Sequence, residues 1–253
     1  MKNSAVSAFL LSAFALCLLV PISPQTVLAM DADELIAKNI EATGGLKTIK
    51  SIQTMFIEGN IFAQGMEFPF TMTQKKPGKM KIEASLMGMS MIQCFADGKG
   101  WSINPMAGVT EAQTMEEMEA KSFALQADME GPLVDYKKKG YSVKYVGEED
   151  VEGTPAYRIS LDTENGFVVD YYFDKEHYLV LMQETRMIIN DSEMVTQTYM
   201  SDYQEIGGMK MPYAVESRMG GQVMSLIKFT KVALNQDIDD SIFSRPVDES
   251  IKK

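Results

Sequence analysis

Residues 54–86, TMFIEGNIFAQGMEFPFTMTQKKPGKMKIEASL, decide the fold class of this chain. One set of apolar residues in this stretch recurs at every second position, which is the period of a β-strand with one buried face. The set consists of Met55, Ile57, Ile61, Phe68, Phe70, Met72, Met80, Ile82, Ala84 and Leu86. Gln64-Gly65 and the segment 75–79 interrupt the runs with residues typical of tight turns. The stretch therefore predicts long antiparallel strands joined by hairpins.

The same alternation returns in the second half of the chain. It predicts seven further strands, at residues 141–146, 156–161, 167–173, 179–189, 194–203, 210–219 and 222–232. Paired glycines at positions 207–208 and 220–221 separate the last of these runs and permit tight turns. No repeat of 20 to 50 residues is visible, so a propeller or solenoid is not expected.

Two segments have helical spacing instead. Asp31 and Glu34 begin the first, an apolar face follows, and Gly44-Gly45 ends it. The second is expected to begin at Thr114, with Glu117 completing a capping box, and to end before Gly131. The expected fold is mainly β with α: a curved antiparallel sheet with two helices able to cover one face. Residues 30–253 are expected to form one domain.

Residues 1–29 have the pattern of a cleavable secretory signal peptide. Lys2 precedes an apolar stretch at residues 5–20, prolines follow, and Ala29 supplies a small residue for cleavage. The apolar stretch is shorter than the roughly 20 residues needed to span a bilayer. Cys17 lies inside it without the preceding small residues of a lipid anchor. We expect export from the cytoplasm as a soluble protein.

Composition narrows the range of functions. The formal net charge of −11 disfavours binding to nucleic acid and to anionic lipid. Cys94 is the one cysteine beyond the signal segment, so no intrachain disulfide is expected there. One histidine and one cysteine are too few for a structural zinc site, and we expect no metal and no cofactor. The protein is expected to be a monomer.

Candidate catalytic groups are scarce. His177 is the single histidine and lies in an expected turn, where an exposed residue is commoner than a general base. Glu148-Glu149-Asp150 is more typical of a solvated charge run than of paired catalytic carboxylates. We therefore expect no enzymatic activity. Alternating methionines at 87, 89 and 91 would suit Cu(I), although packing of a sheet face is their commoner role.

Five stretches resemble the periplasmic outer-membrane lipoprotein-sorting proteins, the family of LolA-like and LolB-like carriers. They are Asp33–Lys38 with Gly44-Gly45-Leu46, Asp97–Trp101, Val151–Tyr157, Asp202–Pro212, and Ile242-Phe243 before Pro246. None of them is a catalytic signature. The resemblance implies an incomplete (half) β-barrel lidded by helices, and a non-enzymatic protein that shelters acyl chains against a concave apolar face.

This resemblance makes lipoprotein acyl chains or other lipids the expected cargo, with transfer partners at the inner and outer membranes. The candidate ligand-binding residues are Met87, Met89, Met91, Trp101, Met118, Leu125, Phe167, Val169, Tyr171 and Phe173. Methionine and aromatic side chains suit an adaptable apolar surface, but each would serve equally in an ordinary packed core. The alternative function is an envelope sensing or binding module that uses the same fold to contact a membrane partner.

Overall fold

The computed structural model describes residues 31–189 and 192–246. The expected signal peptide at 1–29 lies outside these residues. Three α-helices occur in the described part: α1 (Ala32–Ala42), α2 (Leu46–Ser51) and α3 (Glu117–Gln126). Two short 3-10 helices accompany them, η1 (Pro105–Ala107) and η2 (Asp240–Phe243). No helix of the described part has both the length and the apolar character needed to cross a membrane.

One antiparallel sheet contains the thirteen strands of the described residues. Six strands precede α3: β1 (Thr54–Ala63), β2 (Met66–Lys75), β3 (Lys79–Leu86), β4 (Met89–Ala96), β5 (Lys99–Asn104) and β6 (Val109–Thr114). Seven follow it: β7 (Ser142–Val151), β8 (Thr154–Asp162), β9 (Phe167–Asp174), β10 (Val180–Ile189), β11 (Ser192–Ile206), β12 (Met209–Met219) and β13 (Gln222–Leu234). The mainly β fold predicted from the alternating pattern is confirmed.

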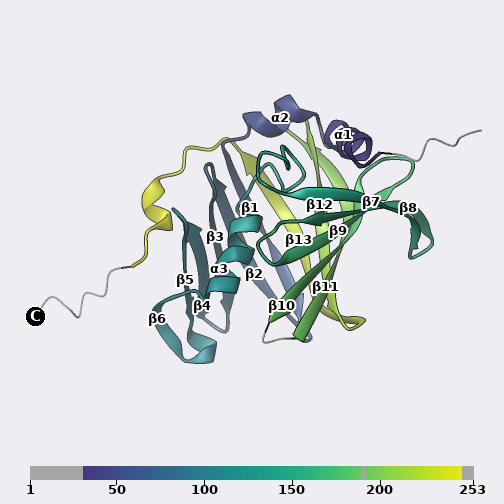
Figure 1. Ribbon diagram of the computed structural model, residues 1–253. Coiled ribbons are helices and arrows are strands. Elements are labelled where there is room, and N and C mark those ends of the chain that lie inside the picture. Colours follow the sequence, from purple (N-terminus) through teal and green to yellow (C-terminus); the bar gives the residue numbers. More distant parts are fainter. Residues whose placement is uncertain (1–30, 190–191, 247–253) are drawn as a thin grey trace, which may run out of the picture.

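The order of strands explains the shape of the sheet. Strands β1 to β6 form one run of hairpins, β7 to β13 form another, and the two runs join where β13 pairs with β1. Strands β6 and β7 end the sheet without pairing to each other, so the sheet curves but does not close (Figure 1). This is the incomplete barrel that the family resemblance implied.

The helices lie on the hollow side of this curve. Helices α1 and α2 lie across one end of the sheet, and α3 packs against β4 and β5 (Figure 1). We call the face that α3 contacts the inner face and the opposite one the outer face. The segment containing η2 runs along the outer face, where Phe243 packs against Cys94 and Trp101. Both faces of this part of the sheet are therefore covered.

Two details of the helices differ from the prediction. Helix α2 was missed, because six residues after Gly45 are too short to show a helical period. Thr114 does not begin α3: it pairs with Trp101 at the end of β6, and α3 starts at Glu117. The backbone hydrogen bonds of the sheet edge take precedence over the capping pattern at this point.

Candidate functional site

Strands β1, β2, β12 and β13 build the middle of the inner face. Their register places Ile57 opposite both Met72 and Val232, and Ile61 opposite both Phe68 and Ile227. Opposite residues of an antiparallel pair point to the same face of the sheet. The apolar positions of neighbouring strands therefore collect on one surface.

This surface remains partly exposed to solvent. Its partly buried apolar residues, including one from the loop after α3, are Ile61, Phe68, Met72, Ile82, Met91, Met129, Met211, Tyr213, Ile227 and Phe229. We call this set the apolar inner face. Contiguous apolar surface that stays in contact with water is characteristic of binding sites, because burying it would lower the free energy.

An aromatic cluster occupies the centre of the apolar inner face. The ring centroid of Phe229 lies 6.1 Å from that of Phe70 and 6.1 Å from that of Tyr213. At Gly59 a Cβ atom would meet the carbonyl oxygen of Lys228 at 2.2 Å and the Phe70 ring at 2.7 Å. Glycine at this bulge between β1 and β13 thus lets the Phe70 ring lie directly over the backbone.

The inner face is closed beneath α1. Here the buried apolar residues of the helix, of the loop after α3 and of strands β8 to β10 pack into one cluster. They are Ala32, Leu35, Ile36, Leu133, Ile159, Leu161, Val169, Tyr171, Phe173 and Val180. We call this cluster the closed end.

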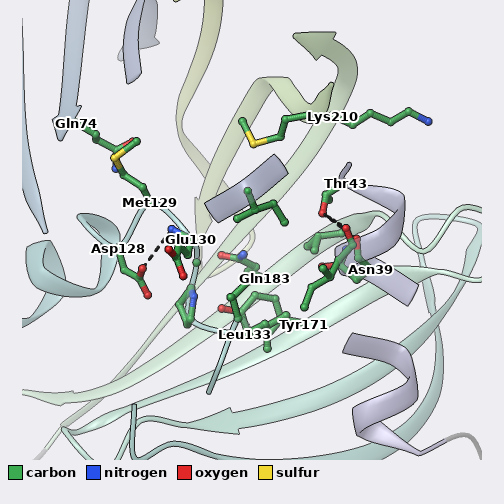
Figure 2. A pocket seen from close by; sticks show the side chains of 17 residues that line it. Asn39, Thr43, Gln74, Asp128, Met129, Glu130, Leu133, Tyr171, Gln183 and Lys210 are labelled. Atoms are coloured by element: carbon green, nitrogen blue, oxygen red, sulfur yellow. Dashed lines mark hydrogen bonds between the residues drawn. The ribbon is translucent and has the colours of Figure 1, made fainter. Parts of the chain in front are cut away.

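A pocket of about 280 Å³ lies between the closed end and the apolar inner face. Helices α1 and α2, the loop 128–134 and strands β2, β9, β10 and β12 contribute its walls. Its apolar lining includes Ile49, Met129, Val180 and Met209, and its polar lining includes Asn39, Thr43, Gln74, Tyr171 and Gln183. Figure 2 shows Tyr171 and Gln183 together, with Met129 on one flank and Asn39 on the other.

Most polar groups of the pocket are engaged within the chain. The Asn39 side-chain amide donates to the carbonyl oxygen of Tyr178 at 2.8 Å, and that of Gln74 donates to the carbonyl oxygen of Gln126 at 2.9 Å. The phenol of Tyr171 and the amide of Gln183 have no hydrogen-bond partner among the described residues. Burial raises the pKa of Tyr171 far above its usual range, so this hydroxyl remains a donor.

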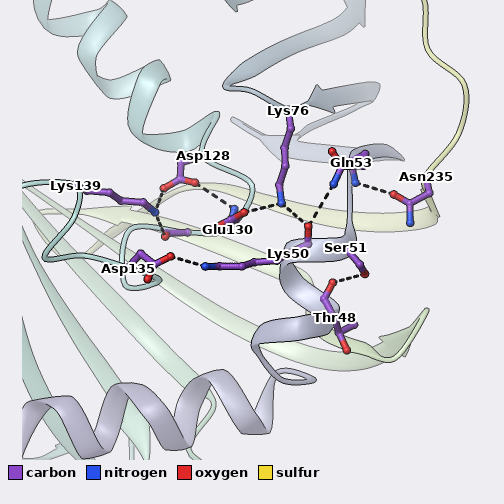
Figure 3. A network of polar contacts seen from close by, with 11 residues as sticks. Thr48, Lys50, Ser51, Gln53, Lys76, Asp128, Glu130, Asp135, Lys139 and Asn235 are labelled. Atoms are coloured by element: carbon purple, nitrogen blue, oxygen red, sulfur yellow. Dashed lines mark hydrogen bonds and ion pairs between the residues drawn. The ribbon is translucent and has the colours of Figure 1, made fainter.

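Ion pairs fix the loop that forms one wall of the pocket (Figure 3). Lys76, at the β2–β3 turn, pairs with Glu130 at 2.7 Å, and Lys139 pairs with Asp128. Lys50 of α2 pairs with Asp135, and the hydrogen bonds from Lys50 and Lys138 lower the pKa of that carboxyl to about 2. The loop is thus attached both to α2 and to the sheet. These pairs also neutralise Asp128 and Glu130 at the pocket.

The predicted residues of β9 all point to the inner side of the sheet. Val169, Tyr171 and Phe173 belong to the closed end, where each is 3% exposed or less, and Phe167 is 2% exposed. Tyr171 also lines the pocket. The others are packing residues whose surface is already covered by protein.

The predicted residues of α3 connect the two ends of the sheet. Phe123 of this helix packs with Met80 and Phe95 near one end of the sheet, whereas Leu125 packs against the closed end. Met118 lies near the β8–β9 turn, where a Cβ added at Gly166 would meet its methyl group at 3.7 Å. Helix α3 therefore bridges the opening of the incomplete barrel.

The remaining predicted residues are not brought together. Met91 lies on the apolar inner face, whereas Met87 and Met89 are 79% and 36% exposed at the tip of the β3–β4 hairpin. Trp101 points to the outer face, and its indole N–H donates to the carbonyl oxygen of Phe243 at 3.2 Å. The segment that contains η2 covers this ring.

Sequence reasoning missed the main contributors to the apolar inner face. Phe68, Tyr213, Ile227 and Phe229 were part of predicted strands but were not among the candidates. Their alternation with polar residues was visible in the sequence and placed them in strands. Knowledge of strand order, which places β13 beside β1, was needed to see that they form one surface.

The candidate catalytic groups named from the sequence lie at the surface of the described part. No group of three or more His, Cys, Asp or Glu side chains among them could hold a metal ion. The side chain of His177 is 63% exposed and lies 3.4 Å from Asp174 within the same turn. The arrangement provides an apolar surface and a polar pocket whose two carboxylates are paired with lysines, and such a combination is typical of a binding site.

Comparison with known proteins identifies the fold. No protein-family model matches the chain, and no curated sequence does. A DUF1329 family protein from Desulfovibrio piger is similar in structure, with a TM-score of 0.58 and 12% identity over 83% of this chain and 95% of that one. The LolA superfamily protein from Nitrosomonas europaea gives a TM-score of 0.57 and 12% identity, over 85% and 98% of the two chains.

A third structure, a domain from Vibrio parahaemolyticus that its description assigns to outer membrane lipoprotein sorting, gives a TM-score of 0.53. It is 10% identical, over 83% of this chain and 95% of that one. Identities this low establish a shared architecture and nothing finer. The chain has a LolA-like fold, as the resemblance in its sequence indicated.

Proposed function

We propose that this chain is a non-catalytic periplasmic carrier that shelters the acyl chains of lipoproteins or similar amphiphiles and passes them towards the outer membrane. The observation that carries the proposal is the apolar inner face, which remains partly exposed inside an open sheet. The signal pattern in residues 1–29 and the lipoprotein-sorting description of one structural neighbour support the location and the class of cargo.

The energetics favour such a cargo. Each CH₂ group removed from water contributes about 0.8 kcal/mol, so moving a long acyl chain from a membrane into water costs on the order of 10 kcal/mol. A carrier offsets this cost by burying the chain. The apolar inner face offers aromatic and methionine side chains, and methionine adapts easily to irregular ligands. Helix α3 bridges the opening through few side chains, so a small displacement of it would enlarge the entrance.

Two substitutions on one strand test where the acyl chain binds. Ile227→Asp places a charge on the apolar inner face, and Val223→Asp places the same charge at a position that is 58% exposed. We expect Ile227→Asp to weaken binding of a fluorescent acyl probe at least about tenfold, because the carboxylate would have to be desolvated beside the chain. Val223→Asp should bind as the unmodified protein does. Equal binding by all three proteins would contradict the proposed site.

A transfer assay tests the carrier role itself. The exported protein, isolated under native conditions, should contain lipid detectable by mass spectrometry, and the loaded protein should deliver an acyl probe to acceptor vesicles. A protein that holds the probe without delivering it would favour the sensing or binding module. A protein that holds no lipid and binds no probe would refute both the cargo and the site.

A further inference from the structure

The pocket beside the closed end contains two hydrogen-bonding groups that the protein does not use. Tyr171 is 97% buried and Gln183 is partly buried; both line the pocket, and neither side chain has a hydrogen-bond partner among the described residues. Buried polar groups in folded proteins almost always have partners. The polar atoms of Tyr171 and Gln183 are not among the fully buried atoms that lack a partner, so both open to the pocket, where water or a ligand can satisfy them.

The chemistry of the pocket favours an uncharged ligand group. Its two carboxylates are already paired, Asp128 with Lys139 and Glu130 with Lys76. Lys210 also lines the pocket, but it is exposed and its ammonium group points away from the other lining side chains in Figure 2. The groups left inside are a phenol that stays protonated and an amide that both donates and accepts. A free carboxylate in this pocket would lie near Asp128 without a cation of its own, so a fatty acid suits it less well than a neutral head.

The position of the pocket adds a second requirement. Met129 lines the pocket and also packs on the apolar inner face, and Met209 lines the pocket and packs beside Met55 and Ile57. A ligand whose head occupied the pocket could therefore extend an apolar chain directly onto the apolar inner face. This arrangement corresponds to an amphiphile with a neutral polar group at the end of its chain.

We propose that the pocket binds the ester group that links an acyl chain to its head, with Tyr171 donating a hydrogen bond to the ester carbonyl oxygen. The Gln183 amide donates a second hydrogen bond to the same oxygen. The inference rests on the proposed function, since the chain must lie on the apolar inner face. It adds the class of ligand: acyl esters, in preference to ethers or free acids.

A pair of probes isolates the ester group. 1-Lauroylglycerol and 1-O-dodecylglycerol have chains of equal length and the same glycerol head, but the ether lacks the carbonyl oxygen. We expect the protein to bind the ester about tenfold more tightly, the effect of one or two neutral hydrogen bonds. Tyr171→Phe should lower ester affinity to the level of the ether and change ether affinity by no more than about twofold. Dodecanoate should bind less tightly than the ester.

Matched variants complete the experiment. Tyr172→Phe removes a hydroxyl from the next residue of β9, which is 4% exposed, packs in a cluster apart from the apolar inner face and does not line the pocket, so this variant should preserve the preference for the ester. Gln183→Leu should reduce the preference as Tyr171→Phe does, and unchanged ether binding shows that each variant is folded. Binding of both glycerol probes with no preference, or a preference that survives both Tyr171→Phe and Gln183→Leu, would overturn this inference alone. Failure to bind either probe would overturn it together with the proposed function.

Discussion

Two regions of the inner face have the same kind of sequence and opposite states of burial. In β9 and its neighbours, alternate residues such as Val169 and Phe173 are 2% and 0% exposed. In β1 and β13, alternate residues such as Ile61 and Phe229 pack on their neighbours but remain partly exposed. Both regions face the same side of one continuous sheet.

The difference comes from what lies above the strands. Leu35 and Ile36 of α1 and Leu133 of the following loop cover the β8–β9 region and complete a core there. The apolar inner face lacks an equally complete cover. An alternating strand therefore specifies which side is apolar, and the helix above it decides whether that side becomes core or binding surface.

The largest expected effect compares one phenylalanine from each region. Phe173→Ala should lower the free energy of unfolding by about 3–5 kcal/mol, because it leaves a cavity in a fully packed core. Phe229→Ala should cost about 1–2 kcal/mol, because solvent already reaches this ring, and it should weaken binding of an acyl probe. Urea unfolding measures the loss of stability in each variant, and a titration with the acyl probe measures the loss of affinity. Equal losses of stability would contradict the distinction between core and binding surface.

A second effect concerns the outer face of the closed end. Asp170 of β9 is fully buried and accepts hydrogen bonds from Arg158 Nε at 2.9 Å and Arg186 Nη2 at 2.8 Å. Burial works to raise the pKa of this carboxyl, but its contacts with Ser160 and the two arginines outweigh burial and lower it. The carboxylate thus connects β8, β9 and β10 behind the core.

Asp170→Asn should lower the free energy of unfolding by about 2–4 kcal/mol, because it leaves two partly buried guanidinium groups without their shared anion. Acyl-probe binding should be unchanged, since Asp170 faces away from the pocket. Urea unfolding and a probe titration check the two statements. Arg218→Met is the control: it breaks ion pairs with Glu152 and Glu216 farther along the outer face, both partly exposed, and should cost less.

The strands were predictable because their apolar positions follow a simple local period. All seven strands expected after α3 occur. Strand β7 extends beyond the expected end at residue 146 to Val151, because its charged residues can form ion pairs on the surface of the sheet, as Glu149 does with Arg158. The helix at Thr114 was placed too early because a capping pattern is local and the β5–β6 pairing is not. The sequence therefore indicates the individual strands and helices more clearly than it indicates which of them pair with each other.

The site was less predictable for the same reason. Trp101 and Met91 both lie in strands of apolar character, but the first faces outward to Phe243 and the second faces inward to the apolar inner face. Which side of each strand is inward depends on register and on which segment covers it. The pocket also needs Asn39 and Gln183, which are far apart in the sequence and carry no motif.

Trp101 gives a smaller effect that separates the two faces. Trp101→Phe keeps an aromatic ring in the cluster beneath η2 but removes the N–H that bonds to the Phe243 carbonyl. Stability should fall by about 1–2 kcal/mol, the cost of one buried hydrogen bond and some lost contact area. Acyl-probe affinity should stay the same. A loss of affinity as large as that in Ile227→Asp would show that the outer face takes part in binding.

The smallest effect concerns the loop that forms a wall of the pocket, and it depends on pH. The pKa of Asp135 is lowered from 3.8 to about 2 by Lys50 and Lys138, so the folded state favours the ionised carboxyl. Its contribution to stability is therefore fully present above about pH 4 and is lost as the pH falls through about 2. Asp135→Asn should be less stable than the unmodified protein by a small amount that is constant near neutrality and shrinks between about pH 4 and 2. Because the pair is partly exposed to solvent, this difference should also decrease with added salt. Urea unfolding of both proteins at several pH values measures it, and a difference that grew on acidification would show that Asp135 is not held as an anion.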